Sequence, residues 1–185
     1  MGHELRLVQS GRFGYNEGEV TFMLALLRPS LYLASVLDVQ APRLAERGLK
    51  GVILDLDNTL LAWGEERLPD ALPAWLEQVR GAGLAACIVS NNKRSRVERL
   101  ANRLGIPWVH GAGKPRGRGF RAAMEIMGTT PAETAVVGDQ IFTDVFGGNR
   151  LGLFTVLVTP ISRREFPGTR LVRLAEWVVM RRLRI

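Results

Sequence analysis

The sequence predicts an α/β fold in which helices cover both faces of a doubly wound parallel sheet of about five strands. Short apolar runs such as 52–54 suit strands that are buried on both faces. Segments with helical apolar spacing alternate with these runs, and parallel strands joined by right-handed helical crossovers are the usual result. Polar residues suited to chemistry directly follow several of the runs, as ligand sites do in such sheets.

Residues 1–21 are rich in glycine and polar side chains, which predicts a loose N-terminal extension. The remaining residues, 22–185, have the length of one domain with a basic C-terminal helix. Residues 22–47 show helical apolar spacing in patches that Pro29 and Pro42 interrupt. We expect amphipathic helices there, packed on the core or resting on a membrane, because the apolar pieces are too short to span a bilayer.

The central strand is expected at residues 50–55, and the helix that follows at 73–80 ends near Gly81 and Gly83. A second strand at 84–89 leads to a helix over 93–104, which places Val97, Leu100, Ala101 and Leu104 on one face. The later elements are expected in this order: a strand at 106–109, a helix at 115–127, a strand at 135–137, a helix from 142 to about 147, a strand at 154–158 and a helix at 171–183.

Asp55 and Asp57 directly follow the first buried strand, and residues two apart on an extended chain point to the same side. Two such close carboxylates repel each other unless a cation lies between them, and Mg²⁺ prefers oxygen ligands and bridges to phosphate. One aspartate can then attack phosphorus while the other transfers protons. The alternative is an acidic turn that merely ends a strand.

Three further signals follow later strands. Ser90, Asn91 and Asn92 offer a hydroxyl and two amides to phosphate oxygens, although the same residues are common in turns. Lys114 precedes a helix and can neutralise a phosphoryl oxygen, although most lysines are solvated charges. Asp139 and Asp144 can complete and support a metal site, or can simply cap a helix.

Together and in this order, the four signals resemble those of the haloacid dehalogenase-type phosphohydrolases. The stretches LKGVILDLDNTLLAW, IVSNNKRSRV, LGIPWVHGAGKP and GDQIFTDVFGGNRLG are similar to the YqeG-type branch of subfamily IIIA, which is related to phosphatidylglycerophosphate phosphatases. The resemblance covers residues from about 27 to the C-terminus and implies a Rossmann-like fold.

The resemblance also implies a role for each residue. Asp55 is the expected nucleophile that forms an aspartyl-phosphate, and Asp57 is the expected general acid and base. Mg²⁺ is expected on Asp55, Asp139 and the backbone carbonyl of Asp57, with Asp144 in support. The residues expected to bind the substrate phosphate are Thr59, Ser90, Asn91 and Lys114.

The spacing between these signals leaves no room for a cap domain. Between Thr59 and Ser90 there is room for one helix with its loops, and between Asn92 and Lys114 for one helix and a strand. We therefore expect an open site, which suits a bulky substrate or one embedded in a surface.

The net charge of +7 points to an anionic partner, and seven arginines against two glutamates place most of it in residues 161–185. Arg170, Arg173, Arg181 and Arg184 share one side of the expected terminal helix, opposite Leu171, Leu174, Ala175 and Val178. This helix either packs on the sheet or binds an anionic membrane. The single cysteine, Cys87, fits the core of a protein in a reducing compartment, so we expect a cytoplasmic enzyme, peripheral on the inner face of the membrane.

Three functions follow from these patterns. The first is a Mg²⁺-dependent phosphatase that acts on a lipid phosphate such as phosphatidylglycerophosphate. The second is a phosphatase for a soluble sugar phosphate or nucleotide, with contacts in an oligomer shielding the site. The third is an RNA- or ribosome-binding protein on the same fold, which the basic tail disfavours because residues 170–185 contain only one aromatic residue, Trp177, on which a base could stack.

Overall fold

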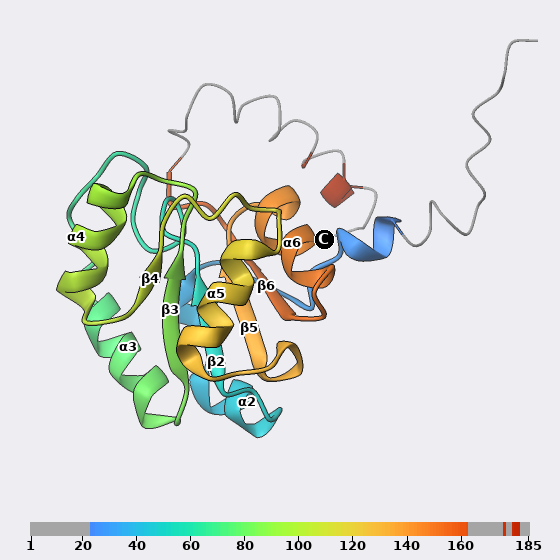
Figure 1. Cartoon of the computed structure of the whole chain (residues 1–185), viewed down its shortest axis with the longest axis horizontal. Helices are drawn as coiled ribbons and strands as arrows, with labels where there is room; N and C mark the ends of the chain where they lie inside the picture. The colour runs from blue at the N-terminus through green and yellow to red at the C-terminus, as the bar shows by residue number, and fades with distance from the viewer. Residues whose placement is uncertain (1–22, 163–175, 177–178, 182–185) are drawn as a thin grey trace, which may run out of the picture.

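The computed structural model describes residues 23–162, 176 and 179–181. Its centre is one six-stranded sheet in which every neighbouring pair is parallel, with the strand order β1-β6-β5-β2-β3-β4 (Figure 1). The strands are β1 (Leu31–Leu33), β2 (Gly51–Leu54), β3 (Ala85–Val89), β4 (Trp108–Val109), β5 (Thr134–Gly138) and β6 (Phe154–Val158).

Helices cover both faces of this sheet, which confirms the doubly wound architecture. Val52 and Leu54 of β2 point to the face that packs against α2, α3 and α4, whereas Ile53 points to the face that packs against α5. The helices are η1 (Val36–Asp38), α2 (Ala41–Glu46), α3 (Leu72–Gly81), α4 (Arg94–Leu104), α5 (Arg118–Met127), η2 (Pro131–Glu133), η3 (Ile141–Val145) and α6 (Phe146–Asn149).

The central strand β2 lies between β3 and β5, and its register brings the ends of all three strands to one edge. Leu54, the last residue of β2, is opposite Ile88 of β3 and Val137 of β5. The residues that follow these strands therefore meet at the carboxyl edge of the sheet, where open α/β sheets bind ligands.

One prediction for the N-terminal region was wrong. Leu31–Leu33 form an edge strand, β1, that pairs with β6 from Leu31 opposite Val156 onwards, where helical packing was expected. Pro29 disfavours a helix across this point, and pairing with a strand about 125 residues away then determines the local structure. Helical structure in this region is limited to one turn at residues 23–26 and to η1 and α2.

Most other predicted elements occur with small shifts at their ends. The strand at 154–158 and the buried face of α4 are confirmed, and Gly105 ends α4 in a left-handed conformation with φ of 62°. The helix expected from residue 115 begins at Arg118, and the one expected from 142 is a π-helical turn, η3, that continues into α6. Cys87 is buried in the core, and burial raises the pKa of its thiol to about 12.

The extension at residues 1–21 and most of the expected terminal helix lie outside the described residues. Of that helix, Val179 and Met180 pack against Ile141, Val145 and Leu157. Within residues 23–162, β2 and β5 are separated only by α3, β3, α4, β4, α5 and η2, so this part of the chain contains no cap domain. Among the described helices, none has the length and apolar character needed to cross a bilayer.

Candidate active site

The loop after β2 turns sharply at Asn58. Asp55 continues the sheet by one residue, because its backbone N–H donates to the carbonyl of Val137. Asn58 has φ of 63°, a left-handed conformation that asparagine tolerates better than most residues with a side chain. Its backbone N–H donates to Leu61, which closes the turn and leaves Asp55 and Asp57 at the carboxyl edge of the sheet.

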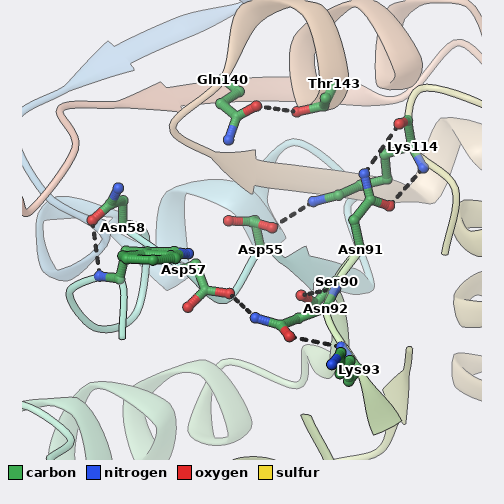
Figure 2. Close-up of a pocket in the computed structure, with 11 residues that line it drawn as sticks. Asp55, Asp57, Asn58, Ser90, Asn91, Asn92, Lys93, Lys114, Gln140 and Thr143 are labelled. Atoms are coloured by element: carbon green, nitrogen blue, oxygen red, sulfur yellow. Dashed lines mark hydrogen bonds and ion pairs between the residues drawn. The ribbon is translucent and has the colours of Figure 1, made fainter. Parts of the chain in front are cut away.

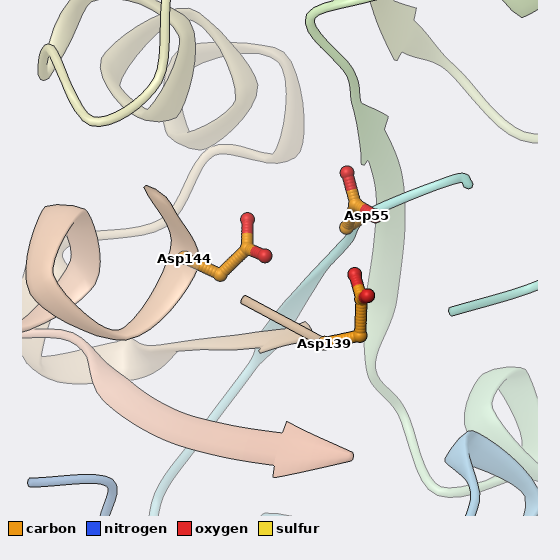
Figure 3. A group of neighbouring side chains, drawn as sticks. All are labelled: Asp55, Asp139 and Asp144. Carbon is orange, nitrogen blue, oxygen red and sulfur yellow. The ribbon is translucent and has the colours of Figure 1, made fainter. Parts of the chain in front are cut away.

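Three buried carboxylates converge at this edge from three segments of the chain (Figure 3). Asp55 follows β2, Asp139 follows β5, and Asp144 belongs to η3. One oxygen of each lies within 4.8 Å of an oxygen of the others. Such a cluster of buried negative charge requires compensation by cations.

Lys114 provides part of this compensation. Its ammonium donates to Asp55 Oδ1 at 2.5 Å and to Asp144 Oδ1 at 2.6 Å, and the side chain is 3% exposed. Burial alone would lower the pKa of Lys114, but Asp144 and Asp55 outweigh it, so that the pKa lies above its ordinary value. The lysine is therefore held as a cation inside the cluster.

A divalent cation fits the charge that remains. Three carboxylates and one ammonium leave two negative charges, and the three acids supply the oxygen ligands that Mg²⁺ prefers. Burial raises the pKa of Asp55 to about 6 in spite of the attraction of Lys114, as expected for a carboxylate whose charge lacks full compensation. The cluster contains Asp55 and Asp139, as expected, and adds Asp144 to them.

Thr59 and Asn91, two of the residues expected to bind phosphate, have clear structural partners. Thr59 is buried, and its hydroxyl lies 3.2 Å from Asp55 Oδ2 and 3.4 Å from Asp139 Oδ1, so it can donate to either carboxylate. The Asn91 amide exchanges two hydrogen bonds with the backbone of Lys114, at 3.1 and 2.8 Å. These contacts fix the acids and the Lys114 loop in place.

A cavity of about 540 Å³ opens over Asp55 and Lys114 (Figure 2). Its lining contains five of the eight predicted site residues, whereas Thr59, Asp139 and Asp144 lie outside the lining. The lining residues are Asp55, Asp57, Asn58, Trp63, Ser90, Asn91, Asn92, Lys93, Lys114, Gln140 and Thr143. The cavity is wide enough for a phosphate ester larger than the phosphoryl group alone.

The Asp57 carboxylate does not belong to the acid cluster, contrary to the expectation that it and the Asp55 carboxylate flank one cation; it binds Arg96, a residue that the sequence reasoning missed. Arg96 Nη2 lies 2.7 Å from Asp57 Oδ1, and Asn92 Nδ2 lies 2.9 Å from Asp57 Oδ2. Because Arg96 and Asn92 bind the Asp57 carboxylate, the atom of Asp57 expected to bind the metal is its backbone carbonyl oxygen. The sequence does contain a signal for Arg96. An arginine in the first turn of a helix is unfavourable because it opposes the helix dipole, and this indicates that it has a specific partner.

Gly138, the last residue of β5, allows Asp144 to lie against the backbone. A Cβ at this position would lie 2.3 Å from Asp144 Cγ, which is closer than any real contact. Asp144 therefore reaches Lys114 across a space that only glycine leaves open. Asp144 Oδ2 also accepts a hydrogen bond from the backbone N–H of Gln140 at 3.2 Å, which ties η3 to the end of β5.

Comparison with known proteins identifies the family. Residues 62–152 match the haloacid dehalogenase-like hydrolases. The chain is 38% identical over 148 residues to the probable phosphatase YqeG of Bacillus subtilis, which covers 80% of this chain and 86% of that protein. A crystal structure of an uncharacterized Listeria monocytogenes protein shares the fold, with a TM-score of 0.53, 20% identity, and 64% of this chain and 85% of that chain covered.

Two phosphatidylglycerophosphate phosphatases are also similar. The yeast mitochondrial phosphatidylglycerophosphatase GEP4 is 30% identical over 152 residues, covering 72% of this chain and 78% of that protein. Phosphatidylglycerophosphate phosphatase 1 of Arabidopsis thaliana is 33% identical over 156 residues, covering 75% of this chain, which spans only 43% of that protein. The chain therefore belongs to the haloacid dehalogenase-like hydrolase family, in the branch that contains YqeG and these phosphatases.

Proposed function

We propose that this protein hydrolyses a phosphate monoester carried by a lipid and forms an aspartyl-phosphate on Asp55 as the intermediate. Family membership supports the general activity of a phosphoric monoester hydrolase. The observation that carries the mechanism is the contact between Asp55 and Lys114, which both line the open cavity, beside the other two acids of the buried cluster. A nucleophilic carboxylate and a fixed cation thus lie where a phosphoryl group would enter.

The reaction has two steps. A carboxylate oxygen of Asp55 forms a bond to phosphorus while the bond from phosphorus to the ester oxygen breaks, and Asp57 gives a proton to the departing alcohol. A water molecule then attacks phosphorus and gives a proton to Asp57, and the bond between phosphorus and Asp55 breaks to release inorganic phosphate. Asp55 and Asp57 both line the cavity, which supports these two roles.

Lys114 and the acid cluster support both steps. The Lys114 ammonium is fixed by Asp144 and can neutralise a phosphoryl oxygen without reorganisation. When bound to Asp55, Asp139 and the Asp57 carbonyl, Mg²⁺ would withdraw negative charge from the phosphoryl group. Ser90 is buried and lines the same cavity, and its hydroxyl accepts a hydrogen bond from the backbone N–H of Asn92 at 3.1 Å.

A lipid-borne substrate agrees with the openness of the site and with the names of the similar phosphatases. Trp63 lines the cavity and is 38% exposed, so it offers an apolar surface at the mouth. The test is release of inorganic phosphate from phosphatidylglycerophosphate in vesicles, compared with a panel of sugar phosphates and nucleotides. We expect the lipid to be the better substrate by kcat/KM; a sugar phosphate or nucleotide turned over faster would contradict the lipid assignment but not the phosphatase activity.

Replacing Lys114 with alanine is expected to lower kcat/KM by roughly a hundredfold, because a preorganised contact to the phosphoryl group contributes about 3 kcal/mol. The matched control is Lys50→Ala, which removes an exposed lysine paired with Glu133 at the opposite edge of the sheet. Because Lys114→Ala also leaves Asp55 and Asp144 without their buried cation, thermal unfolding of each variant must be measured. Similar, small losses in the two folded variants would place Lys114 outside the reaction.

Binding to an anionic membrane is expected to depend on the C-terminal arginines. Each contributes about 1 kcal/mol near such a surface, so replacing Arg173, Arg181, Arg182 and Arg184 with glutamine should weaken flotation with anionic vesicles. Higher salt should have the same effect. Turnover of a vesicle-borne substrate should fall, while that of a soluble ester stays unchanged.

The control variant replaces four exposed basic residues near the amino ends of the strands with glutamine, so that its charge changes by the same amount. These residues are Arg43, Arg47, Lys50 and Arg80. The control variant should bind vesicles better than the C-terminal variant does. Equal weakening would indicate a general charge effect, and no binding by the parent protein at low salt would exclude the membrane role.

A further inference from the structure

The carboxylate of Asp57 is held on both of its oxygens, by Arg96 of α4 and by Asn92 in the loop that precedes this helix. Arg96 donates to Asp57 Oδ1 from Nη2 at 2.7 Å and from Nε at 3.2 Å. Asn92 donates from Nδ2 to Asp57 Oδ2 at 2.9 Å (Figure 2). These three bonds fix the rotation of the carboxylate about both side-chain torsions.

Asn92 is itself held in place. Its backbone N–H donates to the Ser90 hydroxyl at 3.1 Å, and its side-chain oxygen accepts from the backbone N–H of Lys93 at 2.7 Å. Asn92 and Arg96 thus hold the Asp57 carboxylate in one orientation. Asn92 belongs to the loop that follows β3, and Arg96 belongs to α4.

The ion pair of Arg96 differs from those of Arg94 and Arg99 on the same helix. The side chains of Arg96 and Asp57 are 15% and 18% exposed, whereas Arg94 and Arg99 make pairs with Glu98 and Glu66 whose side chains are at least 40% exposed. Pairs as exposed as these contribute little to stability, so Arg96 is the arginine of this helix with a specific, shielded partner.

The location of Arg96 on α4 is unfavourable without a partner. The first turn of α4 contains no acidic residue, and a cation there is repelled by the positive end of the helix dipole. Side chains of a helix lean toward its N-terminus, so an arginine in this turn is directed to the carboxyl edge of the sheet and to Asp57. The contact with Asp57 compensates for an otherwise unfavourable position.

We propose that Arg96 is a positioning residue for Asp57, which it orients for proton transfer to the leaving alcohol. This role rests on the proposed function, in which Asp57 gives that proton. Proton transfer requires the donor to lie within hydrogen-bonding distance of the ester oxygen. Without Arg96, Asp57 loses two of the three bonds that direct it along the cavity wall.

The test compares two esters by kcat/KM, which includes only the steps up to release of the alcohol. An alkyl phosphate, taken as the alkyl ester that the parent hydrolyses fastest, needs a proton on its leaving group; 4-nitrophenyl phosphate does not. Arg96→Ala should lower kcat/KM by about tenfold or more on the alkyl ester, since general acid catalysis contributes roughly 10²–10⁴-fold. The loss on 4-nitrophenyl phosphate should be within about threefold, because no proton transfer assists that departure.

Two variants at the start of α4 complete the comparison. Arg96→Lys keeps a cation that can donate to Asp57 and should recover part of the loss. Arg94→Ala removes a neighbouring arginine whose partner is the exposed Glu98, and it should behave as the parent on both esters.

A double-mutant cycle tests whether Arg96 acts through Asp57. In an Asp57→Asn background, Arg96→Ala should cause no further loss on the alkyl ester, because there is no acid left to position. Three results would overturn the role of Arg96. Arg96→Ala could lower kcat/KM equally on the two esters, or it could speed up hydrolysis of the alkyl ester. In the Asp57→Asn background, it could cause a further loss that adds to the loss from Asp57→Asn. If the parent hydrolyses no monoester, the proposed function fails and this role with it; the other outcomes overturn the role of Arg96 alone.

Discussion

Asp55→Asn is expected to abolish turnover, with a loss on the order of 10⁴-fold or more, because the substitution replaces the nucleophilic carboxylate with a neutral amide, which is too weak a nucleophile to attack phosphorus. The amide has nearly the shape of the carboxylate, so the surrounding contacts persist except for the ion pair with Lys114. The measurement is phosphate release from the best substrate, together with trapping of radiolabelled phosphate on the protein. The parent should give an acid-stable covalent adduct and the variant none.

The structure suggests that this variant folds. Asp55 carries part of a buried cluster with an excess of negative charge, and replacing one carboxylate with an amide reduces that excess. Its melting temperature should therefore stay close to that of the parent in the absence of metal. Near-normal turnover by a variant free of parent protein would refute the covalent mechanism.

Removal of divalent metal is expected to stop the reaction, with a loss of about a thousandfold or more, because a bound metal ion contributes several kcal/mol to stabilisation of phosphoryl charge. Activity should return with Mg²⁺ after chelation by EDTA. The physical reason is the charge of the site: Lys114 neutralises one of three buried carboxylates and leaves two negative charges.

A second readout is independent of turnover. Mg²⁺ binds the folded site only, so it should raise the melting temperature of the parent, and Asp139→Asn should reduce that increase because it removes one ligand. Glu133→Gln is the control, because Glu133 pairs with Lys50 at the amino ends of the strands, away from the acid cluster. This variant should show the same Mg²⁺-dependent rise in melting temperature as the parent. Full activity after thorough chelation, with no effect of Mg²⁺ on melting, would contradict the metal assignment.

The inner strands of the fold could be predicted because each is a short apolar run. Such a run can be identified in the sequence without knowing which strand pairs with it. The edge strand β1 could not, because Leu31 and Tyr32 are 38% and 48% exposed and their strand conformation depends on pairing with β6. The π-helical turn η3 was also missed, since its geometry depends on contacts with distant residues rather than on local preference.

The candidate site was predicted in outline for a related reason. Residues that follow parallel strands must meet at one edge, so the order of the motifs was enough to bring Asp55, Lys114 and Asp139 together. Sequence spacing indicates which side of a strand a residue faces but not which distant side chain binds it, so the contact of Arg96 with Asp57 was found only in the structure. The same limit applies to Asp144, which was expected to orient neighbours and proves to share the acid cluster itself.

The absence of a side chain at Gly138 has a consequence for how this protein tolerates genetic variation. Alanine there would displace Asp144, and with it the second anchor of the Lys114 ammonium, although residue 138 itself carries no group that reacts. Any side chain at residue 138 would thus disturb a buried acid of the candidate site, as a substitution of Asp144 itself would. We therefore expect inherited or engineered substitutions at this glycine to be inactivating, whatever the size or polarity of the new residue.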